Sequence, residues 1–178
     1  MYSSAPQTSA PQTTQPIRVM LVDDQRLVRG GLSMLVNSQP DLQVVMEADD
    51  GLAAIDVFDR MVSEGQAPQI ILMDVRMPHC DGLEAARRIL ERDAQRAESD
   101  CEADERVRII MLTTFDIDEY VYSAVRAGAS GFLLKDTPPE QLLEAIRTVH
   151  RGDAVIAPSA TRRLLEQMIP VLDSPAPV

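Results

Sequence analysis

Polar side chains follow four apolar runs that have the length and composition of buried strands. Asp23 and Asp24 follow the run IRVMLV, Asp74 follows IILM, Thr113 follows RIIML, and Lys135 follows GFLL. Taken singly, these residues have ordinary explanations, because Asp forms turns, Thr favours strands and Lys occurs at sheet edges. Taken together they indicate a site, because the carboxyl ends of parallel strands meet at the edge where α/β proteins bind ligands.

Three carboxylates at one edge have a chemical consequence. They repel one another, which would raise their pKa values unless a cation neutralises them. Hard oxygen ligands without His or Cys nearby favour Mg²⁺. If Mg²⁺ and the ammonium group of Lys135 held a phosphoryl group, Asp74 would attack it as a carboxylate nucleophile, and the hydroxyl of Thr113 would donate to a phosphoryl oxygen. The residues therefore predict Mg²⁺-dependent phosphoryl chemistry centred on Asp74.

Alternating strand and helix patterns surround these residues. The strand runs are apolar on both faces and are separated by amphipathic segments, which is typical of a parallel sheet covered on both faces. We expect an α/β doubly wound, five-stranded parallel sheet flanked by five helices. The predicted strands are residues 17–22, 42–48, 69–73, 107–112 and 131–134, and the predicted helices are residues 27–37, 52–61, 82–90, 119–127 and a segment after Pro139.

The motifs at the strand ends resemble those of the response-regulator receiver family. They are DD after the first strand, D-x-R-M-P-x-x-D-G from Asp74, L-T-T-F-D from Leu112, and G-F-L-L-K ending at Lys135. The resemblance implies a CheY-like, flavodoxin-like fold. The segments A-G-A-S-G-F-L-L-K and P-S-A-T-R-R-L-L resemble the NarL/FixJ-like subfamily, whose receivers precede a LuxR-type helix-turn-helix domain.

The resemblance also implies domain boundaries. We expect a disordered tail at residues 1–16, rich in Ser, Thr, Gln and Pro, and a receiver domain at residues 17–151. Residues 152–178 would form a linker with a short helix, capped by Ser159 or Thr161, toward a DNA-binding domain that this chain does not contain. The charged stretch 91–106 reads as a solvated extension of the third helix.

Metal ligands follow from the family pattern. It implies that Asp24 and Asp74 bind Mg²⁺ directly, together with the backbone carbonyl of Arg76, while Asp23 acts through a metal-bound water. Met77 and Pro78 would shape the loop after the nucleophile.

The family pattern assigns the remaining site residues to phosphate binding and switching. Thr113 and Lys135 would contact the phosphoryl group on Asp74, and Phe132 matches an aromatic residue whose rotamer reports phosphorylation. A sensor histidine kinase would supply the phosphate, and the output would be dimerisation, through the first and fifth helices or through the fourth helix, fifth strand and fifth helix. The chain would act as a signalling switch, not as an enzyme with a separate substrate, and would control transcription through the absent domain.

Two positions depart from the family pattern. Many receivers have a proline after the lysine, often with a cis peptide bond, whereas Asp136 follows Lys135 here. A cis bond before a non-proline residue costs several kcal/mol, so we expect a trans bond or local strain. Arg76 is a large cation at a position that tunes water access in the family, and we expect it to slow or redirect dephosphorylation.

Three other functions fit these residues less well. Aspartate-nucleophile phosphohydrolases place a second Asp two residues after the nucleophile, where this chain has Arg76. A binding module that works without phosphate would not need the complete acidic set with Thr113 and Lys135. A dinucleotide-binding protein would need a glycine-rich loop, which DDQRLVRGG does not supply.

Composition limits the partners and the compartment. The net charge of −11 would repel nucleic acid, so this chain alone should not bind DNA well. No apolar run approaches the roughly 20 residues that span a bilayer, and no signal peptide is recognisable, so we expect a cytoplasmic protein without membrane contact. Cys80 and Cys101 lack partners at metal-site or redox-motif spacing and are expected to be free thiols.

Overall fold

A parallel sheet forms the centre of the protein, which we describe from a computed structural model covering residues 14–99, 106–114 and 118–172. Its six strands have the order β2-β1-β3-β4-β5-β6, and all neighbouring pairs are parallel. The chain moves from β1 outward to β2 and then returns to β3 on the other side of β1. The strands are β1 (Ile17–Val22), β2 (Leu42–Ala48), β3 (Ile70–Asp74), β4 (Arg108–Thr113), β5 (Gly131–Leu134) and β6 (Val155–Ile156).

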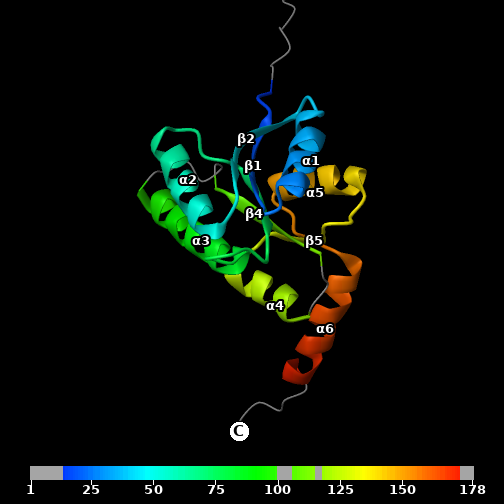
Figure 1. The fold of residues 1–178 in the computed structure, drawn as a ribbon. Helices are drawn as coiled ribbons and strands as arrows, with labels where there is room; N and C mark the ends of the chain where they lie inside the picture. Colours follow the sequence, from blue (N-terminus) through cyan, green and yellow to red (C-terminus); the bar gives the residue numbers. More distant parts are fainter. Residues whose placement is uncertain (1–13, 100–105, 115–117, 173–178) are drawn as a thin grey trace, which may run out of the picture.

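Helices cover both faces of the sheet (Figure 1). In the described residues these are α1 (Arg26–Asn37), α2 (Gly51–Ser63), α3 (Gly82–Ser99), α4 (Asp118–Ala127), α5 (Pro139–His150) and α6 (Pro158–Leu172). The helices α1 and α5 lie together on one face, while α2, α3 and α4 pack in sequence on the other, and α6 packs beside α4. The arrangement is the doubly wound fold that the sequence predicts.

Burial of the central strands provides the core. Every residue of β3 is buried, and in β4 only Arg108 is partly exposed. Such strands have no solvent-facing side, which explains why the sequence shows continuous apolar runs instead of alternation. The consequence for function is that a polar residue at the end of one of these strands is held by a rigid scaffold.

The residues at the starts of α2, α3 and α5 are of types that favour the first turn of a helix. The Asp50 carboxylate caps α2 by accepting a bond from the backbone N–H of Ala53 at 2.8 Å, and Asp81 caps α3 in the same way through Glu84 at 2.9 Å. Pro139 occupies the first turn of α5, where a missing N–H costs nothing. Both acidic caps follow strands, so they also fix how the chain turns at the carboxyl edge of the sheet.

The segment after Arg151 contains the predicted helix but also a strand that the sequence did not predict. Val155 and Ile156 pair with Gly131 and Phe132, which adds the sixth strand, and α6 extends from Pro158 to Leu172. The predicted caps Ser159 and Thr161 are wrong, because the helix begins at Pro158, whose fixed φ favours the first helical position. A two-residue strand gives no periodicity, so the sequence could not signal β6.

The structure can be compared with several other predictions made from the sequence. The described residues contain no cis peptide bond, so the bond between Lys135 and Asp136 is trans as predicted. The helix α3 does continue into the charged stretch as far as Ser99, whereas residues 100–105 lie outside the described part, as do most of the predicted N-terminal tail, Cys101 and residues 173–178. Cys80 is a free thiol as predicted, and it is buried. No helix in the described ranges is long and apolar enough to span a membrane.

Candidate functional site

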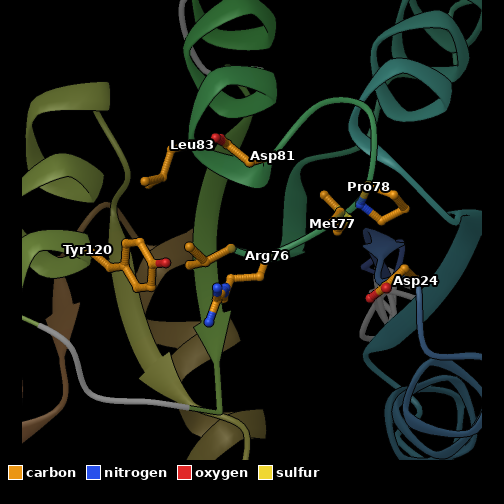
Figure 2. Close-up of a pocket in the computed structure, with 8 residues that line it drawn as sticks. Asp24, Arg76, Met77, Pro78, Asp81, Leu83 and Tyr120 are labelled. Carbon is orange, nitrogen blue, oxygen red and sulfur yellow. The ribbon is translucent and has the colours of Figure 1, made fainter.

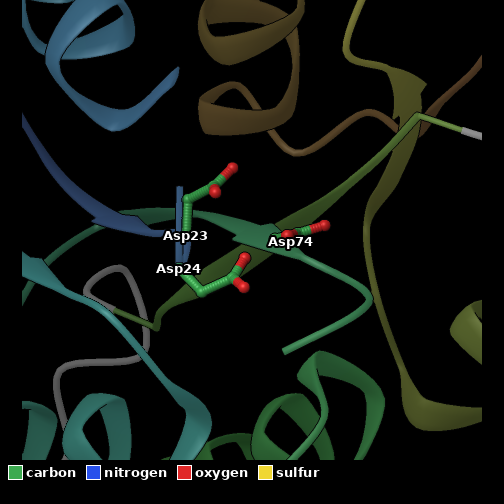
Figure 3. A group of neighbouring side chains, drawn as sticks. All are labelled: Asp23, Asp24 and Asp74. Atoms are coloured by element: carbon green, nitrogen blue, oxygen red, sulfur yellow. The ribbon is translucent and has the colours of Figure 1, made fainter. Parts of the chain in front are cut away.

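The carboxyl ends of β1 and β3 are adjacent, at the point where the chain order reverses direction in the sheet. Val22 pairs with Met73 in this ladder, so the residues that follow them are neighbours as well. Figure 3 shows Asp23 and Asp24 beyond β1 and Asp74 at the end of β3, on one side of the sheet edge. A crevice at this point is where open α/β sheets bind ligands.

Three carboxylates converge there. Asp23, Asp24 and Asp74 each offer an oxygen, and these oxygens lie within 4.8 Å of one another. Asp23 and Asp74 are buried, whereas Asp24 is exposed to solvent. An all-oxygen set with one open side suits a hard cation that keeps part of its water shell, which is the behaviour of Mg²⁺. The donor set therefore fits the metal that the sequence predicts.

The ammonium group of Lys135 lies beside two of these carboxylates. Its Nζ lies 2.7 Å from Oδ2 of Asp23 and 3.1 Å from Oδ2 of Asp74, and its side chain is only 9% exposed. The backbone N–H of Lys135 donates to the carbonyl of Thr113 at 2.8 Å, which fixes the end of β5 beside the end of β4. One ammonium group is thus shared between two buried carboxylates.

Burial dominates the electrostatics of Asp74. It raises the pKa of Asp74 to about 6, against the lowering effect of Lys135 and with a further raising effect from Asp23. Burial also opposes the charged form of Lys135, but its bonds to Asp23 and Asp74 outweigh this effect and raise the Lys135 pKa. Near neutral pH, Lys135 is therefore protonated and Asp74 is mostly an anion.

Tight turns hold the loop that follows Asp74. A Cβ atom on Gly82 would lie 1.9 Å from the carbonyl oxygen of Asp74, so only glycine permits this approach of α3 to β3. Gly82 also donates its N–H to the carbonyl of Val75 at 2.8 Å. His79 adopts a φ of 67°, which is unusual for a residue with a side chain. This loop is therefore set by backbone geometry, and Asp74 is set with it.

A cavity of about 380 Å³ opens beside the acidic residues. Arg76 lies between Tyr120 and Asp24 in Figure 2, with the Tyr120 hydroxyl directed toward the Arg76 side chain. The wall contains Asp24, Val75, Arg76, Met77, Pro78, Asp81, Leu83 and Tyr120. Of the three carboxylates, Asp24 lines this cavity, and Arg76 lines it as well.

The remaining predicted residues lie within the sheet. Thr113 ends β4 and Phe132 lies in β5, and each is 1% exposed. Sequence reasoning did not single out Tyr120, which comes from α4, or Arg29, whose guanidinium reaches the backbone of Asp23. Neither residue belongs to a recognisable motif, so only the fold reveals its position.

Comparison with known proteins agrees with this geometry. Residues 19–147 match the family model described as response regulator receiver domain. The chain is 42% identical over 151 residues to the uncharacterized transcriptional regulatory protein YxjL of Bacillus subtilis, which covers 85% of this chain and 62% of that protein. It is 36% identical over 154 residues to the oxygen regulatory protein NreC of Staphylococcus carnosus, covering 86% of this chain and 64% of that protein. The chain thus spans less than two thirds of these relatives.

Solved structures show the same fold. A two-component response regulator of the LuxR family from Aurantimonas superimposes with a TM-score of 0.73 at 29% identity, covering 87% of this chain and 99% of that one. The signal receiver domain of the putative response regulator NarL from Mycobacterium tuberculosis gives a TM-score of 0.64 at 30% identity, covering 78% of this chain and 99% of that one.

Proposed function

This chain belongs to the response regulator receiver family, and we propose that it is switched by transfer of a phosphoryl group from a sensor histidine kinase to Asp74. The observation that carries the proposal is the position of the Asp74 carboxylate. It ends a fully buried strand, 3.1 Å from the Lys135 ammonium group and within 4.8 Å of oxygens of Asp23 and Asp24. The proposal is supported because a carboxylate that could act as the nucleophile, an ammonium group and oxygens that could bind a metal ion lie together.

Mg²⁺ is the proposed cofactor. Asp24 and Asp74 would hold it together with the backbone carbonyl of Arg76, with Asp23 acting through water. When bound, the ion would neutralise charge on the transferring phosphoryl oxygens, which is the main requirement of phosphoryl transfer. The support from this chain is the convergence of the three carboxylates, of which Asp24 lines a cavity open to solvent.

The transfer step uses the anionic form of Asp74. One carboxylate oxygen forms a bond to phosphorus while the bond from phosphorus to the kinase histidine nitrogen breaks, and its electron pair leaves with the imidazole. Lys135 is already placed beside Asp74 and would move its ammonium group from a carboxylate oxygen to a phosphoryl oxygen. The chain thus promotes its own phosphorylation and, with water as acceptor, its dephosphorylation.

Switching would start at Thr113, whose hydroxyl we propose to donate to the phosphoryl group. Because β4 and β5 are paired through Met111 and Phe132, a shift of Thr113 would alter the packing of Phe132. We propose that the outcome is homodimerisation, followed by transcription control through a DNA-binding domain that follows a receiver domain at residues 17–151 and a linker at residues 152–178. The names of relatives such as YxjL, a transcriptional regulatory protein, support this output.

Incubation with Mg²⁺ and acetyl phosphate tests the proposal. Mass spectrometry should detect one added phosphoryl group, and size-exclusion chromatography in beryllium fluoride should show a change in oligomeric state. Asp74→Asn should abolish both responses, whereas Asp56→Asn, which alters an exposed carboxylate on α2, should leave them intact. Phosphorylation that persists in Asp74→Asn would contradict the assignment, and sustained release of phosphate from many small esters would indicate a phosphohydrolase.

A further inference from the structure

Arg29 in the first turn of α1 reaches back to the loop that carries the acidic residues. Its Nη1 donates to the backbone carbonyl of Asp23 at 2.6 Å, and its Nε donates to Oε2 of Glu47 on β2 at 3.0 Å. The Arg29 side chain is only 17% exposed, whereas that of Glu47 is 39% exposed. The guanidinium group of Arg29 therefore connects the loop that follows β1 both to α1, which carries Arg29, and to β2, which carries Glu47.

The bonded carbonyl belongs to the peptide unit that joins Asp23 to Asp24. Because a peptide unit is planar, fixing its oxygen also fixes the direction in which the chain enters Asp24. The preceding N–H is fixed too, since Asp23 donates to the carbonyl of Ala48 at 3.1 Å. The N–H of Gln25, the residue after Asp24, donates to Oδ1 of Asp23 at 2.8 Å. The backbone around Asp24 is thus held on both sides, although the Asp24 side chain itself is exposed.

We propose that Arg29 is a positioning residue for the metal site, which sets Mg²⁺ affinity by fixing the peptide between Asp23 and Asp24 without touching the ion. This inference rests on the proposed function, because it assumes that these carboxylates bind Mg²⁺. Groups that orient metal ligands from behind commonly change metal affinity by about 10-fold or more when removed. Glu47 in turn orients Arg29, because its carboxylate accepts a hydrogen bond from the same guanidinium group that binds the Asp23 carbonyl.

Electrostatics alone predicts the opposite result. Arg29 carries a positive charge near the place where a divalent cation would bind, so its removal should strengthen Mg²⁺ binding if charge were its only effect. Positioning predicts weaker binding instead. The sign of the change therefore separates the two explanations.

The test measures Mg²⁺ affinity by isothermal titration calorimetry with magnesium chloride on the whole chain. Arg29→Met should weaken binding about 10-fold. Arg29→Lys keeps the charge, but a single ammonium group cannot reproduce both bonds, so binding should still be weaker than in the unaltered chain. Arg26→Met, on an exposed residue of the same helix, is the matched loss of charge and should leave affinity equal or slightly higher.

Two further readouts exclude a general loss of structure. Each variant is titrated below its unfolding transition, which urea unfolding without Mg²⁺ locates. The weakening in Arg29→Met should persist at high salt, because positioning is not screened whereas a charge effect at an exposed site is. Equal or tighter Mg²⁺ binding by Arg29→Met, with Arg29→Lys unchanged, would overturn this inference alone. Absence of Mg²⁺ binding by the unaltered chain would overturn the proposed function and this inference with it.

Discussion

The pKa values of two carboxyl groups shift in opposite directions at the two edges of the sheet, where the strands begin and where they end. At the amino edge, Arg147 in the last turn of α5 donates to both carboxylate oxygens of Asp41, at 2.7 and 3.0 Å, and holds the pKa of Asp41 below its ordinary value. At the carboxyl edge, burial raises the pKa of Asp74 to about 6 although Lys135 is adjacent. The first arrangement stabilises the fold, whereas the second keeps a buried, unfavourable anion at the position where we propose that a cation and a phosphoryl group bind.

Loss of the shared cation should have the largest effect on this contrast. Lys135→Met leaves Asp23 and Asp74 buried without their ammonium partner, and removing one side of a buried ion pair costs about 3 kcal/mol or more. Urea unfolding without Mg²⁺ should therefore show a lower midpoint near neutral pH, and Mg²⁺ should recover part of the loss. An unchanged midpoint would mean that the two carboxylates are solvated well enough to need no cation.

Loss of the anion should act in the opposite direction. Asp74→Asn removes a charge that burial disfavours, so the metal-free protein should gain stability. The pKa change from 3.8 to about 6 would correspond to about 3 kcal/mol, and we expect about 1 to 2 kcal/mol because the neighbouring cavity admits water. Urea unfolding of both proteins in a chelator checks this. A destabilised Asp74→Asn variant would show that the bond to Lys135 outweighs burial.

The pH dependence of this gain has a definite sign. Since the folded pKa of Asp74 lies above the unfolded value, the folded state binds more protons between them, and the stability contributed by protonated Asp74 is lost as pH rises toward about 6. The stability difference between Asp74→Asn and the unaltered protein should therefore widen from about pH 5 to about pH 7. Urea midpoints across this range measure it, and saturating Mg²⁺ should narrow the difference at the higher pH. A pH-independent difference would contradict the raised pKa.

Much of this arrangement was predictable from the sequence because it depends on local patterns. Continuous apolar runs predicted β3 and β4. Once these strands are part of a parallel sheet, Asp74 lies beside Asp23 and Asp24. What the sequence could not supply is the choice among similar side chains. Nothing in the pattern separates Arg29, which returns to the Asp23 backbone, from the exposed Arg26 in the same turn.

Short-range signals predicted a helix after Arg151 but failed for the strand β6. The sequence predicted a linker with a short helix beyond Arg151, yet before that helix Val155 donates its N–H to the carbonyl of Ser130 at 3.1 Å and Ala157 donates to that of Phe132 at 2.9 Å. Such backbone bonds depend on a strand edge formed by residues far away in the chain, not on the composition of the segment. The same is true of Tyr120, which reaches the cavity only because α4 packs beside α3.

The smallest effect is expected at the amino edge, where the ion pair is exposed. Arg147→Met removes the bonds to Asp41 and Gln39, but an exposed pair of this kind contributes about 1 kcal/mol or less. The urea midpoint should fall slightly, the fall should shrink at high salt, and Mg²⁺ affinity should stay as in the unaltered protein. A change in Mg²⁺ affinity would contradict the separation of the two edges, because it would mean that a paired charge at the amino edge influences carboxylates at the opposite end of the strands.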